Sequence, residues 1–212
     1  IFMKIKIKYP RAKPYFSNKS KNGILKDISG ILDSGMLTQG AYVAKFESKF
    51  KEEIGTDYAI ATSSCTSALE IAIRSLGLEN TNILVTTNTW MSCANVILLT
   101  GNKPVFVDIN ADTLNMDTDD LISKLEGVGA ILWVHMAGLI SPDFFKVKKI
   151  CDKKGIRIIE DCAHAHGATI NGKLAGSLGD VGCFSFYPTK IMATGEGGMI
   201  TTNNADIAAK AD

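Results

Sequence analysis

The sequence predicts an α/β domain built as three layers, with a mostly parallel seven-stranded sheet covered by helices on both faces. Seven short apolar runs occur along the chain, and helical patterns separate most of them. Runs that are apolar at nearly every position are typical of parallel strands, because such strands are buried on both faces. Strands that alternate with helices indicate that each helix packs back onto the sheet.

The first amphipathic segment precedes the strands, and the others lie between them. Residues 40–54 place Val43, Phe46, Phe50 and Ile54 on one face of a helix. Further helical patterns occupy 66–76, 91–100, 117–126 and 142–154. The predicted strands are 58–62, 82–86, 104–108, 130–135, 156–161, 181–186 and 198–202. Residues 162–180 are rich in glycine and alanine and lack a helical period, so we expect an irregular segment there.

Composition narrows the class of protein. The chain has 212 residues, 46% of them hydrophobic, and a formal net charge of +1, which favours a globular domain and argues against a nucleic-acid partner. Its five cysteines are scattered without a CxxC motif, as in proteins of a reducing compartment. The sequence shows neither a signal peptide nor an apolar run long enough for a membrane span, so we expect a cytoplasmic protein without a membrane partner.

The residues after the first predicted strand suit a phosphate group. Ligands of parallel α/β sheets bind beyond the carboxyl ends of the strands. Here the strand runs into SSCTSAL (63–69) at the start of a helix. A helix N-terminus offers unpaired N–H groups and a positive dipole, and the hydroxyls of Ser64, Thr66 and Ser67 could add donors. The alternative is ordinary N-capping by small hydroxyl residues.

Trp90 falls just past the end of the second predicted strand, in TTNTWMS (86–92). A tryptophan at the mouth of the sheet could stack on a flat aromatic ligand, since its ring offers a large apolar face. The alternative is a tryptophan that belongs to the core or covers a helix. The position alone does not decide between the two.

The fifth predicted strand ends in a group of acids and imidazoles. Glu160, Asp161, Cys162, His164 and His166 follow one another at short spacing. One interpretation is a metal site, but the group lacks a tidy fourth ligand, and we expect no metal. The other is a carboxylate at the end of a buried strand that faces a cation, because a buried Asp161 without a partner would be costly. A structural ion pair is the simplest form of this second interpretation.

The sixth predicted strand runs into a lysine. In CFSFYPTK (183–190) the proline ends the strand ladder and sets a turn that projects Lys190 over the edge of the sheet. The following glycines, Gly195, Gly197 and Gly198, permit close approach of the backbone and unusual dihedral angles. Taken singly, Lys190 is an ordinary loop lysine in water.

Taken together, the strand ends fit the needs of pyridoxal phosphate (PLP). This cofactor needs a phosphate cradle, a flat partner for its ring, an anion at its pyridine nitrogen and a lysine amine on its aldehyde. The chain offers a candidate for each within one α/β sheet. A nicotinamide-binding Rossmann protein is excluded because the first strand-to-helix turn, SSCTSAL, lacks the GxGxxG pattern.

Several segments, in order, resemble the sugar aminotransferases of the DegT/DnrJ/StrS type, a branch of the fold-type-I PLP enzymes. These segments are SSCTSAL, TWMSCANVI, PVFVDIN, VHMAG, IEDCAHAHGA, FSFYPTK and GEGGMITT. The resemblance implies that residues 1–212 form the PLP-binding large domain, led by an N-terminal helical segment of about 1–56. The small C-terminal domain of the family is missing. The start at Ile1, ahead of Met3, and the end inside an opening helix with Asn203 or Asn204 as N-cap also predict an incomplete chain.

The resemblance assigns a role to each strand-end residue. Lys190 is implied to be the catalytic lysine that forms a Schiff base with PLP and later moves a proton. Asp161 is implied to pair with the pyridine nitrogen, His164 to lie near the ring hydroxyl, and Trp90 to stack on the ring. SGMLTQG (34–40) matches a loop that helps to shape the substrate site.

The implied phosphate ligands include one departure from the family pattern. Thr66, the backbone around Cys65, and Ser185 are implied to hold the phosphate. Cys65 stands where the family usually has glycine, so its side chain is expected either to crowd the phosphate or to be tolerated in the first helical turn.

The resemblance also implies a reaction and its partners. The family's typical reaction is amino transfer from glutamate to a nucleotide-linked keto-sugar, carried out by a homodimer. Two alternatives remain. Some relatives are PLP-family sugar dehydratases with histidine in place of the lysine, which Lys190 argues against. The other is a catalytically incomplete fragment or homologue that serves as a ligand-binding or regulatory protein.

Overall fold

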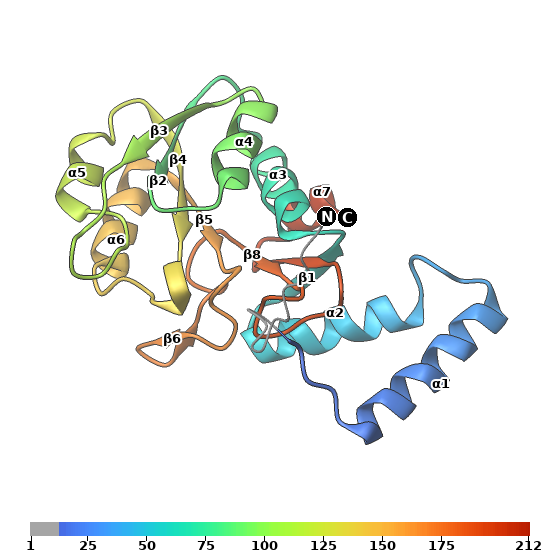
Figure 1. Cartoon of the computed structure of the whole chain (residues 1–212). Coiled ribbons are helices and arrows are strands. Elements are labelled where there is room, and N and C mark those ends of the chain that lie inside the picture. The colour runs from blue at the N-terminus through green and yellow to red at the C-terminus, as the bar shows by residue number, and fades with distance from the viewer. Residues whose placement is uncertain (1–12) are drawn as a thin grey trace, which may run out of the picture.

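The computed structural model describes residues 13–212, whose centre is a seven-stranded sheet (Figure 1). Its strands are β1 (Tyr58–Thr62), β2 (Asn82–Thr86), β3 (Lys103–Val107), β4 (Val128–Val134), β5 (Arg157–Asp161), β8 (Val181–Ser185) and β9 (Gly198–Thr202). The order across the sheet is β1-β9-β8-β5-β4-β2-β3. Only β9 is antiparallel to its neighbours, β1 and β8, and the other pairs are parallel. The predicted mostly parallel seven-stranded sheet is therefore confirmed.

Five helices match the predicted periodic segments closely, whereas the first helix has no periodic segment of its own among the predictions and falls within the N-terminal helical segment that the resemblance implied. The helices are α1 (Asn18–Ser34), α2 (Ala41–Ile54), α3 (Cys65–Ser75), α4 (Met91–Leu99), α5 (Thr118–Ser123), α6 (Phe144–Lys154) and α7 (Ala205–Ala211), with a 3-10 turn at Met136–Gly138. α5 is shorter than the predicted 117–126. The side chain of Asn204 accepts the N–H groups of Asp206 and Ile207, so Asn204 is the N-cap of α7. Met3 and the first part of the predicted segment 1–56 lie outside the described residues.

Two hydrophobic cores lie on opposite faces of the sheet, as alternation along each strand requires. Leu84, Ile131 and Trp133 belong to the core under α2, α5 and α6. Ile83 and Leu132, their neighbours in sequence, belong to the core under α3, α4 and α7. Figure 1 shows α3 and α4 on one side of the sheet and α5 and α6 on the other. The three-layer prediction is confirmed.

α2 attaches to the edge of the sheet through aromatic packing and one hydrogen bond. The ring of Phe50 packs edge-on against the rings of Phe184 and Phe186. The carboxylate of Glu47 accepts the N–H of Ala61 on the edge strand β1 at 2.8 Å. This hydrogen bond occupies a donor that an edge strand would otherwise leave free.

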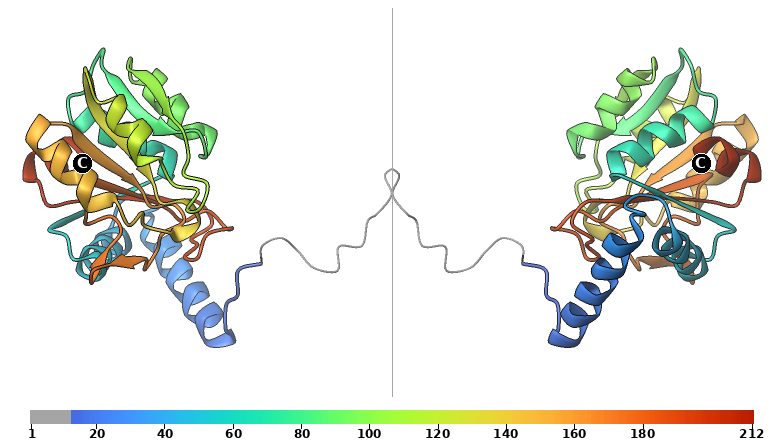
Figure 2. Two further views of the ribbon diagram at one scale, coloured as in Figure 1. Left: turned by 90° about the vertical axis from the view of Figure 1, so that its left-hand side faces the viewer. Right: turned by 90° about the vertical axis from the view of Figure 1, so that its right-hand side faces the viewer.

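α1 differs from the other helices because it has no buried residue. In both views of Figure 2 it extends away from the body of the domain. Apolar side chains such as Leu25 and Leu32 are 65% and 64% exposed. Across residues 13–212, no helix combines the length and the apolar character that a membrane crossing needs.

The segment predicted to be irregular, 162–180, contains turns and one small hairpin. Its two-residue strands are β6 (Thr169–Ile170) and β7 (Lys173–Leu174). The hydroxyl of Thr201 donates to the carbonyl of Gly176 at 2.7 Å and fixes the far end of the hairpin on the sheet. The expectation of a segment without a helix is confirmed, and the short hairpin is the difference.

Candidate functional site

Three predicted site segments meet in a row at one edge of the sheet. In the β8–β9 register Ser185 lies opposite Gly198, and Gly197 forms a bridge to Ser64 just after β1. A Cβ atom on Gly198 would clash with the carbonyl carbon of Ser64, so only glycine permits this approach. The expected close approach of the backbone is confirmed for Gly198, whereas a Cβ on Gly195 would meet nothing within 4 Å. This close approach leaves only one strand, β9, between the start of α3 and Ser185.

The N-terminus of α3 combines a cap with free donors. Ser64 is the N-cap, and its Oγ accepts the N–H of Ser67 at 3.1 Å, so the capping interpretation is correct for this residue. The amide N–H groups of Cys65 and Thr66 have no hydrogen-bond partner among the described residues. Thr66 is exposed. Two N–H groups and one hydroxyl therefore remain for an anion at the positive end of an 11-residue helix.

Asp161 ends β5 as a buried carboxylate with only 6% of its surface exposed. Its Oδ1 accepts the N–H of Ala163 at 2.9 Å, and the thiol of Cys93 donates to its Oδ2 at 3.1 Å. No lysine, arginine or histidine of residues 13–212 forms an ion pair with it. The cation expected to face Asp161 is thus not supplied by the described part of the chain.

Cys65 turns its side chain toward Asp161. The residue is 8% exposed, and its Sγ lies 3.8 Å from Asp161 Oδ1. Burial, followed by the charge of Asp161, raises the pKa of the thiol well above its usual range, which keeps it uncharged at neutral pH. The thiol thus packs inward against Asp161, while the backbone N–H of Cys65 stays at the start of α3.

Lys190 lies in the turn after β8, where its N–H donates to the carbonyl of Tyr187 at 2.9 Å. It is half-buried. Burial lowers the pKa of His164 and His166, and the nearby charge of Lys190 lowers both further, that of His166 to about 4. Lys190 also acts on the pKa of Cys65. Its ammonium therefore lies near both the start of α3 and the segment after β5.

Trp90 is the N-cap residue of α4 and is 75% exposed. The alternative of a core tryptophan is therefore wrong. Its carbonyl accepts the N–H of Cys93 at 3.0 Å. Because the thiol of Cys93 contacts Asp161, Trp90 lies one helical turn from a residue that touches the carboxylate. An exposed aromatic ring is thus available at the same edge of the sheet.

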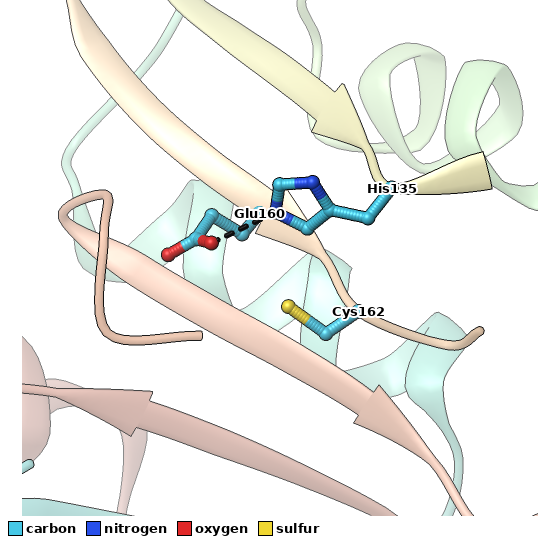
Figure 3. A group of neighbouring side chains, drawn as sticks. All are labelled: His135, Glu160 and Cys162. Atoms are coloured by element: carbon cyan, nitrogen blue, oxygen red, sulfur yellow. Dashed lines mark hydrogen bonds and ion pairs between the residues drawn. The ribbon is translucent and has the colours of Figure 1, made fainter. Parts of the chain in front are cut away.

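The group of acids and imidazoles after β5 is divided between the two faces of the sheet. Asp161 faces α3 and α4, whereas Glu160 and Cys162 face the other way and lie close to His135 at the end of β4 (Figure 3). Among residues 13–212, this buried trio is the one group of three whose metal-binding atoms lie within 4.8 Å of one another. It differs from the group that the sequence suggested, since it includes His135 and lacks Asp161, His164 and His166.

The carboxylate of Glu160 is fully used by hydrogen bonds. Its Oε2 accepts His135 Nε2 at 2.8 Å, and its two oxygens accept the N–H groups of Gly176, Leu178 and Gly179 at 2.7–3.0 Å. A carboxylate has about four acceptor sites, so little capacity remains for a metal ion. Glu160 anchors the turn between β7 and β8, a role that sequence reasoning missed.

Comparisons with known proteins place the chain in a family. Residues 18–212 match the profile of the DegT/DnrJ/EryC1/StrS aminotransferase family. A GDP-perosamine synthase from Vibrio cholerae is 35% identical over 182 residues, which cover 84% of this chain and 49% of the relative. The chain spans about half the length of the curated relatives it matches.

Two solved structures share the fold. An aminotransferase from Psychrobacter cryohalolentis has a TM-score of 0.86 and 32% identity, covering 94% of this chain and 51% of the other. An E. coli GDP-4-keto-6-deoxy-D-mannose-3-dehydratase with bound hydrated PLP also has a TM-score of 0.86 and 32% identity, covering 94% of this chain and 52% of the other. Both likenesses extend over nearly all of the chain.

Proposed function

Because this chain belongs to the DegT/DnrJ/EryC1/StrS aminotransferase family, we propose that the full-length protein is a PLP-dependent aminotransferase. It transfers an amino group from glutamate to a nucleotide-linked keto-sugar. The sugar substrate is inferred from relatives such as the GDP-perosamine synthase. The proposal includes a homodimer, a cytoplasmic location and small-molecule substrates as partners.

The observation that carries the proposal is the buried carboxylate of Asp161. The carboxyl group of Asp161 is 6% exposed and has no ion-pair partner in residues 13–212, so it can still accept a cationic donor. A protonated pyridine nitrogen would supply that donor. The site therefore fits the ring of PLP at the position where the sequence expected it.

The remaining groups fit the other parts of the cofactor. The free N–H groups of Cys65 and Thr66, the hydroxyl of Thr66 and Ser185 would hold the phosphate, since Gly198 brings α3 close to the end of β8. Trp90 would cover the ring, and His164 would lie beside the ring hydroxyl. Each of these roles is inferred from the position of the residue at the end of the sheet.

The catalytic work of the chain falls to Lys190 and Asp161. When bound, PLP would supply an aldehyde for the amine of Lys190 and an electron sink for the substrate carbanion. Lys190 would hold the cofactor through Nζ and, once released, would move a proton at the reacting substrate carbon. Asp161 would keep the proton on the ring nitrogen. The uncharged His164 and His166 add no positive charge beside Lys190, because burial lowers their pKa.

The structural likeness to a dehydratase favours a second candidate, a PLP-family sugar dehydratase. The presence of Lys190 argues for the aminotransferase, because the dehydratase resemblance implies histidine at this position. A protein that binds the cofactor without catalysis is the third possibility. Conversion of the bound cofactor by glutamate separates an enzyme from a protein that only binds the cofactor, since the latter does not perform it. Analysis of the product formed from a nucleotide-linked keto-sugar separates the aminotransferase from the dehydratase, because only the aminotransferase adds nitrogen to the sugar.

The test uses purified full-length protein. We expect a visible absorbance band from the lysine-bound cofactor, and borohydride reduction followed by peptide mapping should place the label on Lys190. Lys190→Ala should lose the band, whereas Lys173→Ala, which removes an exposed lysine from β7, should keep it. A band that survives in Lys190→Ala would refute the assignment, and the absence of any band in the wild type would refute the proposed cofactor.

A further inference from the structure

Two cysteines from different helices contact the carboxylate of Asp161. Cys93, in α4, has no exposed surface, and Cys65, in α3, has 8% exposed. Their sulfur atoms lie 3.1 Å from Oδ2 and 3.8 Å from Oδ1 of Asp161, respectively. We call Cys65 and Cys93 the thiol clamp. The shorter contact, from Cys93, is the stronger of the two.

The clamp and one backbone group occupy most of the acceptor capacity of the carboxylate. A carboxylate has about four lone-pair sites. At Oδ1, the N–H of Ala163 and the thiol of Cys65 take both sites, and at Oδ2 the thiol of Cys93 takes one. One acceptor site therefore remains free, and it lies on Oδ2. A single further donor can bind there while every other hydrogen bond stays in place.

The chemistry of Cys93 makes it a lasting donor. Burial, followed by the negative charge of Asp161, raises the pKa of its thiol well above the usual range. The S–H group therefore keeps its proton at neutral pH and donates to the carboxylate. A thiol is a weak donor, but its bond to a buried ionised acceptor is strengthened by the low local dielectric.

We propose that Cys93 is a positioning residue that holds the carboxylate of Asp161 in one orientation through its S–H···Oδ2 hydrogen bond, leaving the second acceptor site of Oδ2 for one cationic donor. The proposal rests on the proposed function in one respect, since the donor is taken to be the ring nitrogen of PLP. Cys93 itself has no exposed surface. Its effect passes through Asp161.

The first measurement tests the hydrogen bond without any cofactor. The S–H stretch absorbs in an infrared window that is free of other protein bands, and hydrogen bonding lowers its frequency. The difference spectrum of wild-type apoprotein minus Cys93→Ser should isolate a shifted band. In Asp161→Asn, which offers a neutral and weaker acceptor, the band should move to higher frequency. A Cys93 band at the frequency of a free thiol, or one unchanged in Asp161→Asn, would overturn the proposal.

The second measurement tests positioning through PLP affinity of the full-length protein. Cys93→Ala, which removes the donor, should raise the PLP dissociation constant about 3- to 12-fold, the scale of one ordinary hydrogen bond, because a thiol is a weak donor. Cys93→Ser keeps a donor and should stay within about twofold of the wild type. Cys151→Ala removes an equally buried thiol from α6 on the other face of the sheet and should leave the constant unchanged.

The outcomes distinguish the clamp from the proposed function. Equal weakening by Cys93→Ala and Cys93→Ser would assign Cys93 a packing role and overturn the positioning role. An unchanged constant in Cys93→Ala would overturn it as well. A wild-type protein that binds no PLP would refute the proposed function and the assignment of the donor, while the infrared shift would still decide whether the thiol holds the carboxylate.

Discussion

The imidazole of His135 and the carboxylate of Glu160 lie 2.8 Å apart, and neither side chain has exposed surface (Figure 3). They stand on adjacent strands, β4 and β5, and the N–H of His135 also donates to the carbonyl of Asp161 at 3.1 Å. The pair therefore ties the end of β4 to the strand that carries the candidate cofactor carboxylate. On the opposite face of the same strand, Asp161 is held by thiols.

Glu160→Gln should destabilise the fold strongly. The amide nitrogen of glutamine is a donor, so it would face N–H groups that now point at a carboxylate oxygen. We expect the free energy of unfolding in urea to fall by about 2–4 kcal/mol, as for other buried donors left without an acceptor. Glu126→Gln, at an exposed position, should change it by less than about 0.5 kcal/mol. A loss of that small size in Glu160→Gln would contradict the anchoring role.

Gly198→Ala should disturb the start of α3. The added methyl would clash with the backbone of Ser64, and backbone atoms cannot move aside cheaply. We expect a loss of about 1–3 kcal/mol in the free energy of unfolding together with weaker PLP binding. The matched control is Gly30→Ala in α1, where a Cβ meets nothing within 4 Å. That change should stabilise slightly, by about 0.5–1 kcal/mol, because alanine is the better helix former. If both variants behave alike, close approach at Gly198 is not important.

Asp161→Ala should separate binding from catalysis. The proposed phosphate ligands and Lys190 remain in this variant, so we expect PLP to stay bound at saturating concentration, although with lower affinity. The half-reaction with glutamate, followed by rapid-mixing absorbance, should slow by roughly 100-fold or more, the scale of lost proton-transfer assistance. Asp152→Ala, on the surface of α6, is the control and should react normally. Near-normal turnover by Asp161→Ala would remove Asp161 from its proposed role.

Periodicity was sufficient to predict the sheet and most helix bounds. A strand with apolar residues on both faces, as in IIED (158–161), needs helices on both sides of the sheet. A short stretch of sequence is enough to recognise such a strand. Successive side chains of a strand point to opposite faces, so the neighbouring residues Glu160 and Asp161 must face opposite layers. The suggested grouping of five residues at the end of β5 and just after it failed for this reason. Sequence proximity does not place side chains together on a strand.

Contacts between distant segments could not be predicted. Cys93 reaches Asp161 across 68 positions in sequence, and its place in a helical pattern, MSCANVILL, suggests only a core residue. His135 gave a weak signal as a polar residue that ends an apolar strand, but its partner depends on the pairing of β4 with β5. Strand order is set by long-range packing, which short sequence windows do not contain.

The stability of the protein should depend on pH through His166. Its folded-state pKa is about 4, below the ordinary value of 6.5, because of burial and the charge of Lys190. Between these two values the unfolded chain binds a proton that the folded chain excludes, so stability is full above about pH 6.5 and is lost as the pH falls toward 4. Allowing for partial exposure, we expect a loss of about 2 kcal/mol from this group. Urea unfolding at a series of pH values should show a shallower decline in His166→Gln, and parallel curves for the two proteins would exclude His166 as the cause.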